Sequence, residues 1–257
     1  MTVSSASHIR FTLPRIAALA LLLALWLGTA AQAAPDACLD VDLTATPILT
    51  REDFFRKALS LPLGIRTTDS ARDVAQKIGA WLDTYQPRPE YPDDVYALTT
   101  LRETVHAGLI NDYCIGAILV DEKGNVILKA HNTQFTTKRS DLHGEMTLLT
   151  NFETDPKLSV YRQGIAMRPG MRVYSSAEPC PMCLIRLATV AVDTRYVAGS
   201  AEDGMASRVK FLPGAWRKLC EAHPTTQALC APILRSLGHL LFYTFLLRDD
   251  SLNDYGK

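Results

Sequence analysis

Two short fragments constrain the fold of this chain more than any other feature: His143-Gly144-Glu145 and Pro179-Cys180-Pro181-Met182-Cys183. Each fragment begins a predicted helix, the first over 143–154 and the second ending at about Val190. One imidazole and two thiolates are three zinc ligands, and a catalytic zinc site keeps three protein ligands and leaves a fourth position for water. Amides and dipoles at helix N-termini also favour the thiolate form of cysteine. The fold must therefore bring the starts of two helices to one metal ion, held by His143, Cys180 and Cys183.

Glu145 follows the predicted ligand His143 by two positions, on the first turn of the same helix. This offset lets its carboxylate face the open metal position without joining the ligands. Water on zinc has a pKa of about 7 rather than ~15.7. A carboxylate beside it can take the proton and deliver protons to a ring nitrogen and a leaving amine. The pattern predicts hydrolytic release of ammonia from an amidine-like carbon, with Glu145 as the catalytic residue.

The order His-x-Glu followed by Pro-Cys-x-x-Cys is the signature of zinc nucleobase deaminases, and residues 93–203 resemble the cytidine deaminase superfamily. The segment Ala177–Cys183 looks most like the branch of guanine deaminase and tRNA adenosine deaminase. Leu142–Glu145, together with Ala130-His131-Asn132, is also similar to fungal-type cytosine deaminase.

This resemblance implies one Zn²⁺ per chain and a substrate-binding role for Asn132 and Gly144. An Asn amide offers a donor and an acceptor to the edge of a heterocycle, whereas the alternative role of Asn132 is a structural cap in its loop. Gly144 stands where many relatives have Ala. The resemblance further implies a five-stranded sheet whose last two strands are parallel, and a homodimer.

The periodicity of apolar residues predicts an α/β fold, a sheet with helices on both faces. Together with the resemblance, this implies a three-layer α/β/α, cytidine-deaminase-like mixed sheet of five strands, with a helical N-terminal appendage and a helical C-terminal tail. The deaminase domain is expected over 92–247, after an appendage and proline-rich linker over 34–91 and before a tail over 248–257. The expected elements are a helix from Ala71 to Leu82, a linker over 86–92, a helix from about Asp93 to Leu109, a hairpin over 114–128, strands over 171–175 and 195–199, and mainly helix over 213–247.

The N-terminal 33 residues have the order of a secretory signal peptide. Arg10 and Arg15 precede an apolar run over 16–27, and Ala31-Gln32-Ala33 provides a small-x-small cleavage pattern. The alternative is a retained membrane anchor, for which the apolar run is marginal in length. The sequence therefore predicts a periplasmic or secreted protein, with no membrane attachment after cleavage near Ala33.

The net charge of the chain does not favour binding to a polyanion. Lys and Arg number 27 and Asp and Glu number 27, and removal of residues 1–33 takes away two Arg and leaves a net charge of −2. Binding a polyanion requires clustered cations that displace counterions. We expect a small nucleobase or nucleoside of the guanine, cytosine or adenine type as substrate, and no nucleic acid. Two alternatives stay open: a base deaminase acting on RNA or DNA, and a non-catalytic zinc-binding protein.

The remaining cysteines and histidines carry weaker predictions. Cys220 and Cys230 close a short loop and are candidates for a disulfide in an oxidising compartment, and a Cys38–Cys114 bond is a further candidate. Cys180 and Cys183 have two alternatives to a catalytic metal, a disulfide and a closed structural zinc with a fourth protein ligand. Four histidines are expected to be surface or packing residues: His106, His131, His223 and His239.

Overall fold

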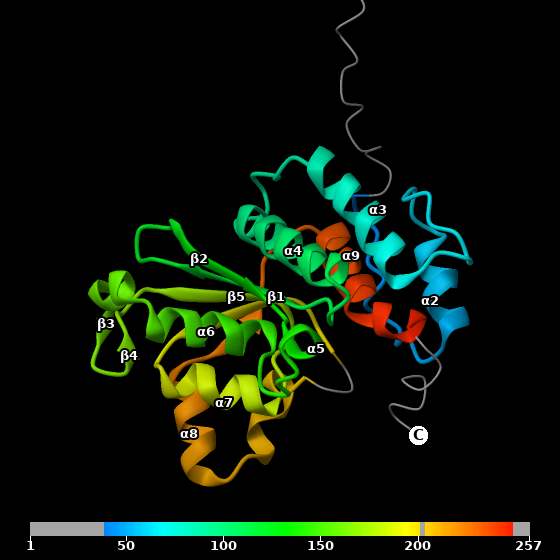
Figure 1. The fold of residues 1–257 in the computed structure, drawn as a ribbon. Helices are drawn as coiled ribbons and strands as arrows, with labels where there is room; N and C mark the ends of the chain where they lie inside the picture. The colour runs from blue at the N-terminus through cyan, green and yellow to red at the C-terminus, as the bar shows by residue number, and fades with distance from the viewer. Residues whose placement is uncertain (1–38, 201–203, 249–257) are drawn as a thin grey trace, which may run out of the picture. The chain divides into compact units, whose positions relative to one another are not determined.

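A computed structural model describes residues 39–200 and 204–248. Its centre is a five-stranded sheet in the order β2-β1-β5-β6-β7 (Figure 1). β1 runs antiparallel to β2 and β5, whereas β5, β6 and β7 are mutually parallel. The strands are β1 (Gly116–Val120), β2 (Val126–His131), β5 (Arg172–Ala177), β6 (Asp193–Ala198) and β7 (Thr225–Gln227). The predicted mixed sheet of five strands, with the last two parallel, is confirmed.

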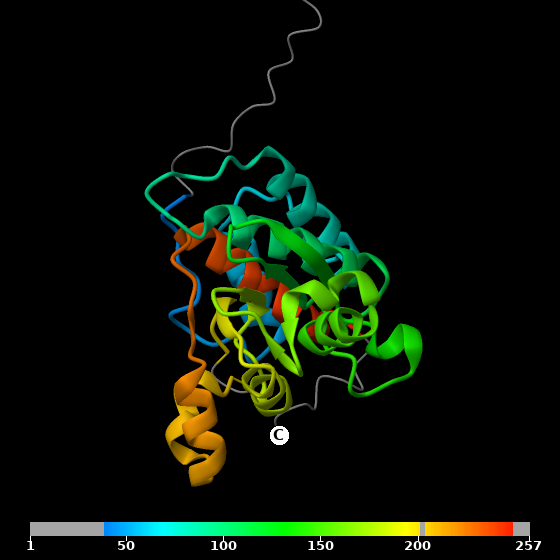
Figure 2. The ribbon, with the colours of Figure 1, turned by 90° about the vertical axis from the view of Figure 1, so that its left-hand side faces the viewer.

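Helices cover both faces of the sheet (Figures 1 and 2). They are α4 (Asp94–Leu109) and α9 (Pro232–Phe242) on one face, and α6 (Gly144–Thr154) and α7 (Pro181–Thr189) on the other. Successive side chains of β1 point to opposite faces of the sheet, so they contribute to two different hydrophobic cores. Ile118 and Val120 join the cluster that contains α4 and α9, here called the first core, whereas Ala117 and Leu119 join the cluster that contains α6 and Leu187 of α7, the second core. The predicted three-layer arrangement is confirmed.

Residues 39–92 add two helices to the outside of α4 and α9. They are α2 (Arg51–Ala58) and α3 (Ala71–Thr84), and each begins with a capping box, at Thr50 and Ser70 respectively. Phe54 and Ile78 are fully buried in the first core, together with Leu101 of α4 and Leu237 of α9. The predicted helix is confirmed, but the predicted separation of an appendage is not observed. The apolar faces of α2 and α3 are buried by the same core as the sheet.

The proline-rich segment over 86–92 is irregular, as predicted, but it is fixed to the core by the residues that flank it. Asp94 is fully buried and accepts hydrogen bonds from Tyr85 Oη (2.6 Å), Arg88 N (3.0 Å) and Ala231 N (2.7 Å). The neighbouring Asp93 accepts from Tyr174 Oη at 2.7 Å. The sequence predicted only that a helix begins at these carboxylates. Their hydrogen bonds also connect the start of α4 to the segment before it and to residues that come much later in the chain.

The segment 213–247 is mainly helical, as predicted, but a short strand that was not predicted interrupts it. β7 lies between α8 (Gly214–Ala222) and α9, where Thr225 and Thr226 pair with Thr194 and Arg195 of β6. β-branched residues favour a strand once a neighbouring edge is available. Five shorter elements were not predicted: α5 (Gln134–Thr137), η2 (Pro156–Tyr161), β3 (Arg162–Gln163), β4 (Ala166–Met167) and η3 (Ala206–Phe211). The helical turn η4 (Tyr243–Leu247) lies within the predicted helical segment.

Among the residues described, none of the helices has the length and apolarity to cross a membrane. The predicted signal peptide over 1–33 and all but the first residue of the predicted tail over 248–257 lie outside those residues.

Candidate active site

The three predicted ligands lie together where α6 and α7 begin. His143 is the N-cap of α6 and Cys180 is the N-cap of α7, both with extended backbone, and Cys183 lies one turn into α7. One donor atom from each residue lies within 4.8 Å of the others. The two helices lie on the same face of the sheet. The prediction that two helix starts meet at one point is therefore confirmed.

The spacing and ionisation of these donors fit zinc. His143 Nδ1 and Cys180 Sγ are 3.7 Å apart, and tetrahedral zinc with ordinary Zn–S and Zn–N bonds places such a pair about 3.6 Å apart. A hydrogen bond from Cys183 lowers the pKa of Cys180 to about 4, against the opposing effect of burial. The same hydrogen bond raises the pKa of Cys183. The pair thus already holds one thiolate, and a divalent cation favours the loss of the second proton.

Two alternatives for these cysteines do not match this geometry. Both thiols are free, so the structure does not contain a Cys180–Cys183 disulfide. In the described part of the chain the donor group has three members. A site of three donors keeps the fourth position that a closed structural site would fill.

Glu145 is buried next to these donors, on the first turn of α6. Ser175 Oγ of β5 donates to its Oε1 at 2.8 Å, and its buried Oε2 has no hydrogen-bond partner among the residues that the structure describes. Burial, and then the negative charge of Cys180, raise the pKa of Glu145. A carboxylate that is easily protonated, with one free oxygen beside a metal-ligand set, can accept and return a proton.

Asn132 follows β2 and is completely buried. Its Nδ2 donates to Asp112 Oδ1 at 2.8 Å and to Gln134 Oε1 at 2.9 Å, while its Oδ1 is buried without a partner. Both amide hydrogens are therefore used within the protein. The remaining Oδ1 can serve only as an acceptor for a ligand.

Residues 93–199 match the family model for the cytidine and deoxycytidylate deaminase zinc-binding region. The match covers less than half of the chain. The resemblance predicted for residues 93–203 is thereby confirmed, and the zinc-binding description agrees with the donor set of His143, Cys180 and Cys183.

The chain is also similar to several known proteins. A tRNA-specific adenosine deaminase from Bacillus subtilis is 34% identical over 91 residues, which are 35% of this chain and 52% of that protein. A tRNA(Ile)-lysidine synthase from Thermus thermophilus is 27% identical over 148 residues, 58% of this chain and 26% of that protein. The chain thus spans about half or less of the length of these curated relatives.

Similar solved structures carry related names. One, from a study of A-to-I editing by tRNA:A34 deaminases at the wobble position, is 25% identical with a TM-score of 0.41, over 51% of this chain and 88% of that chain. A guanine deaminase from Nitrosomonas europaea is 20% identical with a TM-score of 0.45, over 61% of this chain and 86% of that chain.

Sequence reasoning missed Asp112, which fixes the position of Asn132 and the start of α5. Its fully buried carboxylate accepts from Asn132 Nδ2, from Phe135 N at 3.0 Å and from Thr136 N at 3.1 Å, so it also caps α5. The only signal in the sequence is a turn-type residue in Asn111-Asp112 after a helix, which predicts a solvated turn. Only the tertiary fold brings Asn132 and α5 to this carboxylate.

Gly144 and Glu178 have packing roles that the structure defines. A Cβ on Gly144 would lie 3.0 Å from Ile115 O, so the start of α6 approaches the backbone before β1 closely. Glu178 accepts from Ser200 N at 3.3 Å and from Ser207 N at 3.1 Å, which orients the segments that follow β6. These contacts give Glu178 a role in orienting the loop. The predicted substrate contact of Gly144 stays a prediction.

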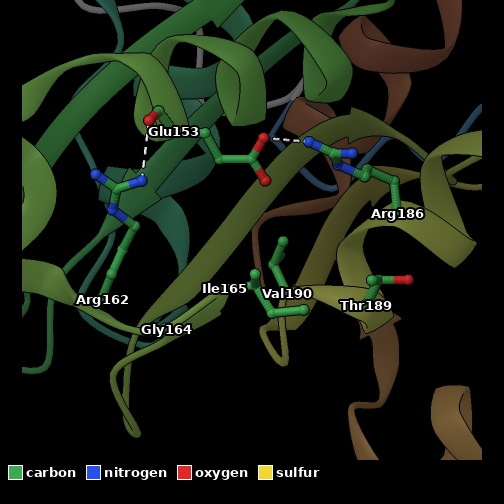
Figure 3. Close-up of a pocket in the computed structure, with 7 residues that line it drawn as sticks. All are labelled: Glu153, Arg162, Gly164, Ile165, Arg186, Thr189 and Val190. Atoms are coloured by element: carbon green, nitrogen blue, oxygen red, sulfur yellow. Dashed lines mark hydrogen bonds and ion pairs between the residues drawn. The ribbon is translucent and has the colours of Figure 1, made fainter.

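A pocket of about 340 Å³ lies at the other end of α6 and α7 (Figure 3). Its polar lining contains Glu153, whose carboxylate pairs with Arg186 and whose carbonyl oxygen accepts from Arg162 Nη1 at 2.9 Å. Glu153 is eight positions from Glu145, about 12 Å along a helix. This pocket is separate from the metal-ligand set, and the Glu153–Arg186 pair fixes α6 and α7 to each other at that end.

The other cysteines do not form the predicted bridge. Cys220 and Cys230 are free thiols, and the candidate Cys220–Cys230 disulfide is wrong for this structure. The intervening β7 separates them, because Cys220 packs with Leu184 beneath α7 whereas Cys230 belongs to the first core. Cys114 is a buried thiol that accepts from Thr244 Oγ1 at 3.1 Å. Its suggested partner Cys38 lies outside the described residues.

Proposed function

We propose that this chain is a zinc-dependent hydrolytic deaminase that releases ammonia from a small nucleobase or nucleoside of the guanine, cytosine or adenine type. The observation that carries the proposal is the free oxygen of the buried Glu145 carboxylate beside His143, Cys180 and Cys183. A buried carboxylate oxygen without a partner is costly, and it is explained by a proton-transfer role towards a water and a substrate.

His143, Cys180 and Cys183 would hold the zinc, which when bound supplies Lewis acidity that lowers the pKa of water. Glu145 takes the proton of the attacking water on its free Oε2, while Ser175 holds Oε1 through its 2.8 Å hydrogen bond. The raised pKa of Glu145 favours keeping that proton until the ring nitrogen accepts it as the C–O bond forms. Glu145 then takes the second proton, from the hydroxyl now on the substrate carbon, and passes it to the amine, which leaves as ammonia when the C–N bond breaks. The burial of Glu145 excludes bulk water from this transfer.

Asn132 sets a requirement on the substrate. Because Asp112 and Gln134 occupy both hydrogens of its amide, Oδ1 must accept from an N–H or O–H of the ligand. A heterocycle with an N–H next to the amidine-like carbon meets this requirement. A site built to accept one hydrogen bond discriminates strongly against analogues that lack the donor.

A target base within tRNA is the second candidate, favoured by the similarity to the tRNA-specific adenosine deaminase of Bacillus subtilis. The balanced charge of 27 basic and 27 acidic residues supports the small substrate instead.

One panel of assays tests the function. The chain over 34–257 would be loaded with zinc, and ammonia release would be measured on cytosine, guanine, adenine, their nucleosides and tRNA. Glu145→Gln is the matched control, because an amide oxygen can still accept from Ser175 but cannot move the proton. We expect turnover of at least one small substrate, abolished in Glu145→Gln with zinc content unchanged. Turnover of tRNA alone would select the second candidate, and no turnover at all would support the non-catalytic alternative.

We also propose that the chain is exported after cleavage near Ala33, on the basis of the basic, apolar and small-residue order over 1–33. Mass spectrometry of the chain expressed with its own N-terminus tests this, with Ala34 as the expected first residue. An intact N-terminus in the cytoplasmic fraction would contradict it. A homodimer, proposed from the family resemblance, would give twice the chain mass of 28.3 kDa, less any removed segment, in light scattering.

A further inference from the structure

A second group of metal-type donors lies outside the deaminase site, between α4 and β2. Glu103 and His106 are one turn apart on α4, and His131 is the last residue of β2, which lies beside α4 (Figure 1). One donor atom from each of the three residues lies within 4.8 Å of the others. The sequence predicted only surface or packing roles for His106 and His131.

The distances within this group match the spacing of ligands on a metal ion and are long for hydrogen bonds. Nδ1 of His106 and Nδ1 of His131 each lie 3.4 Å from Glu103 Oε2. An N–H···O hydrogen bond is ordinarily 2.7–3.2 Å long. Two ligands on a tetrahedral ion with bonds of about 2.1 Å are about 3.4 Å apart. Both measured separations therefore match the edge of a tetrahedral site.

The chemistry and exposure of the three side chains also suit a cation. Two imidazoles and one carboxylate form a common three-ligand set for zinc. The hydrogen bond with His131 is the largest of the effects that lower the pKa of Glu103, so its carboxylate is charged at neutral pH. The Glu103 side chain is only 11% exposed, whereas that of His106 is 57% exposed. An ion can thus reach the group from solvent and find a fixed anion beneath it.

We propose that Glu103, His106 and His131 form a second binding site for a divalent transition-metal ion of the zinc type. The site is separate from His143, Cys180 and Cys183, and it does not depend on the proposed function. His131 immediately precedes Asn132, so an ion here would fix the end of β2 to α4 at the residue before the substrate amide.

The test is metal stoichiometry of an untagged chain, since a polyhistidine tag binds the same ions. The chain carrying one zinc equivalent would be titrated with Zn²⁺ by calorimetry, with native mass spectrometry as a count. We expect one further equivalent, weakened at least about tenfold by His106→Ala, which removes an exposed side chain and leaves the fold intact. His131→Gln should have the same effect. A rise in Tm with added zinc should occur in the parent chain and vanish in His106→Ala.

Two controls separate this site from others. His223→Ala removes a histidine that lies 3.9 Å from Asp193, at a different strand, and should leave the second equivalent unchanged. Cys183→Ala should lose the first equivalent and keep the second. The proposal is overturned if the parent binds no second equivalent, or if His106→Ala and His131→Gln bind it as tightly as the parent does.

Discussion

Replacing Asp112 by Asn should impair substrate binding while leaving the zinc content unchanged. The buried carboxylate accepts two hydrogen bonds on Oδ1, from Tyr113 N and Asn132 Nδ2. It accepts three on Oδ2, from Phe135 N and from both N and Oγ1 of Thr136. Asn has the same shape but turns one of these oxygens into a donor. Whichever oxygen is lost, at least two donors of the protein then face an NH₂ group.

The magnitude follows from these contacts. A hydrogen bond to a charged group contributes roughly 1.5–3 kcal/mol, and an unsatisfied buried partner costs a similar amount. Two lost bonds therefore lower the free energy of unfolding by about 3 kcal/mol or more. The Asn132 amide also loses its fixed orientation, so its Oδ1 no longer points reliably at the substrate. Loss of that one hydrogen bond to the substrate should reduce kcat/KM about 10- to 100-fold, mainly through KM.

The pH dependence has a definite sign. Burial acts to raise the pKa of Asp112, but hydrogen bonds from Thr136, Asn132 and Tyr113 outweigh it, and the net pKa is lowered. A carboxyl with a lowered pKa in the folded state stabilises it above the unfolded value of about 3.9. That stability is lost as the pH falls through the folded pKa. The stability difference between the parent and Asp112→Asn should therefore be largest at neutral pH and shrink below about pH 4.

Asp121→Asn is the matched control for this experiment. Asp121 is also buried and accepts from Lys123 N, Asn125 N and Asn125 Nδ2, all within the hairpin turn. It should lose some stability and keep its KM. Urea unfolding, zinc analysis and steady-state kinetics would be measured on all three proteins. The reasoning is refuted if Asp112→Asn, folded and zinc-loaded, has a KM within twofold of the parent.

Three further changes have expected outcomes. Cys180→Ala and Cys183→Ala should each lose zinc, since a site with three protein donors cannot spare one; metal analysis equal to that of the parent would contradict this. Ser175→Ala should lower kcat about 10- to 100-fold with zinc retained, because the Glu145 carboxylate loses its hydrogen bond. An unchanged kcat would show that Ser175 does not contribute to catalysis. Leu82→Ala, in α3, should cost about 2–5 kcal/mol and lower the single unfolding transition of the whole chain; a separate early transition would show that α2 and α3 unfold independently.

The metal-ligand set was predictable because its signal is local. A histidine or cysteine at a helix N-cap, with its neighbours within one turn, needs only the helix start to define its position. The start of α7 is marked in the sequence by Pro179 and Pro181. The hairpin was predictable for the same reason. Asp121–Asn125 forms a turn between two apolar runs, and the turn residues bond among themselves.

Long-range contacts account for what the sequence did not predict. β7 is a strand because three residues pair with the edge of β6, and Thr225–Gln227 has no alternation long enough to predict this. Asp112 has the local pattern of a solvated turn but contacts Asn132 and α5, which follow it by 20 positions or more. The prediction of a Cys220–Cys230 disulfide was based only on their short separation along the chain. That separation does not reveal that a strand, β7, lies between the two cysteines.

The folded unit extends beyond the region that carries the family pattern. The second residue of the region 93–199 is Asp94, a fully buried carboxylate whose hydrogen-bond donors Tyr85, Arg88 and Ala231 all lie outside that region. A buried charge that loses its partners costs roughly 3–5 kcal/mol, a large part of the stability of a typical domain. Without the rest of the chain, the region 93–199 would also leave exposed the face of α4 that α3 and α9 bury. The segments before and after it are therefore part of what keeps the zinc-binding region folded, and the helices before α4 are structural components of it.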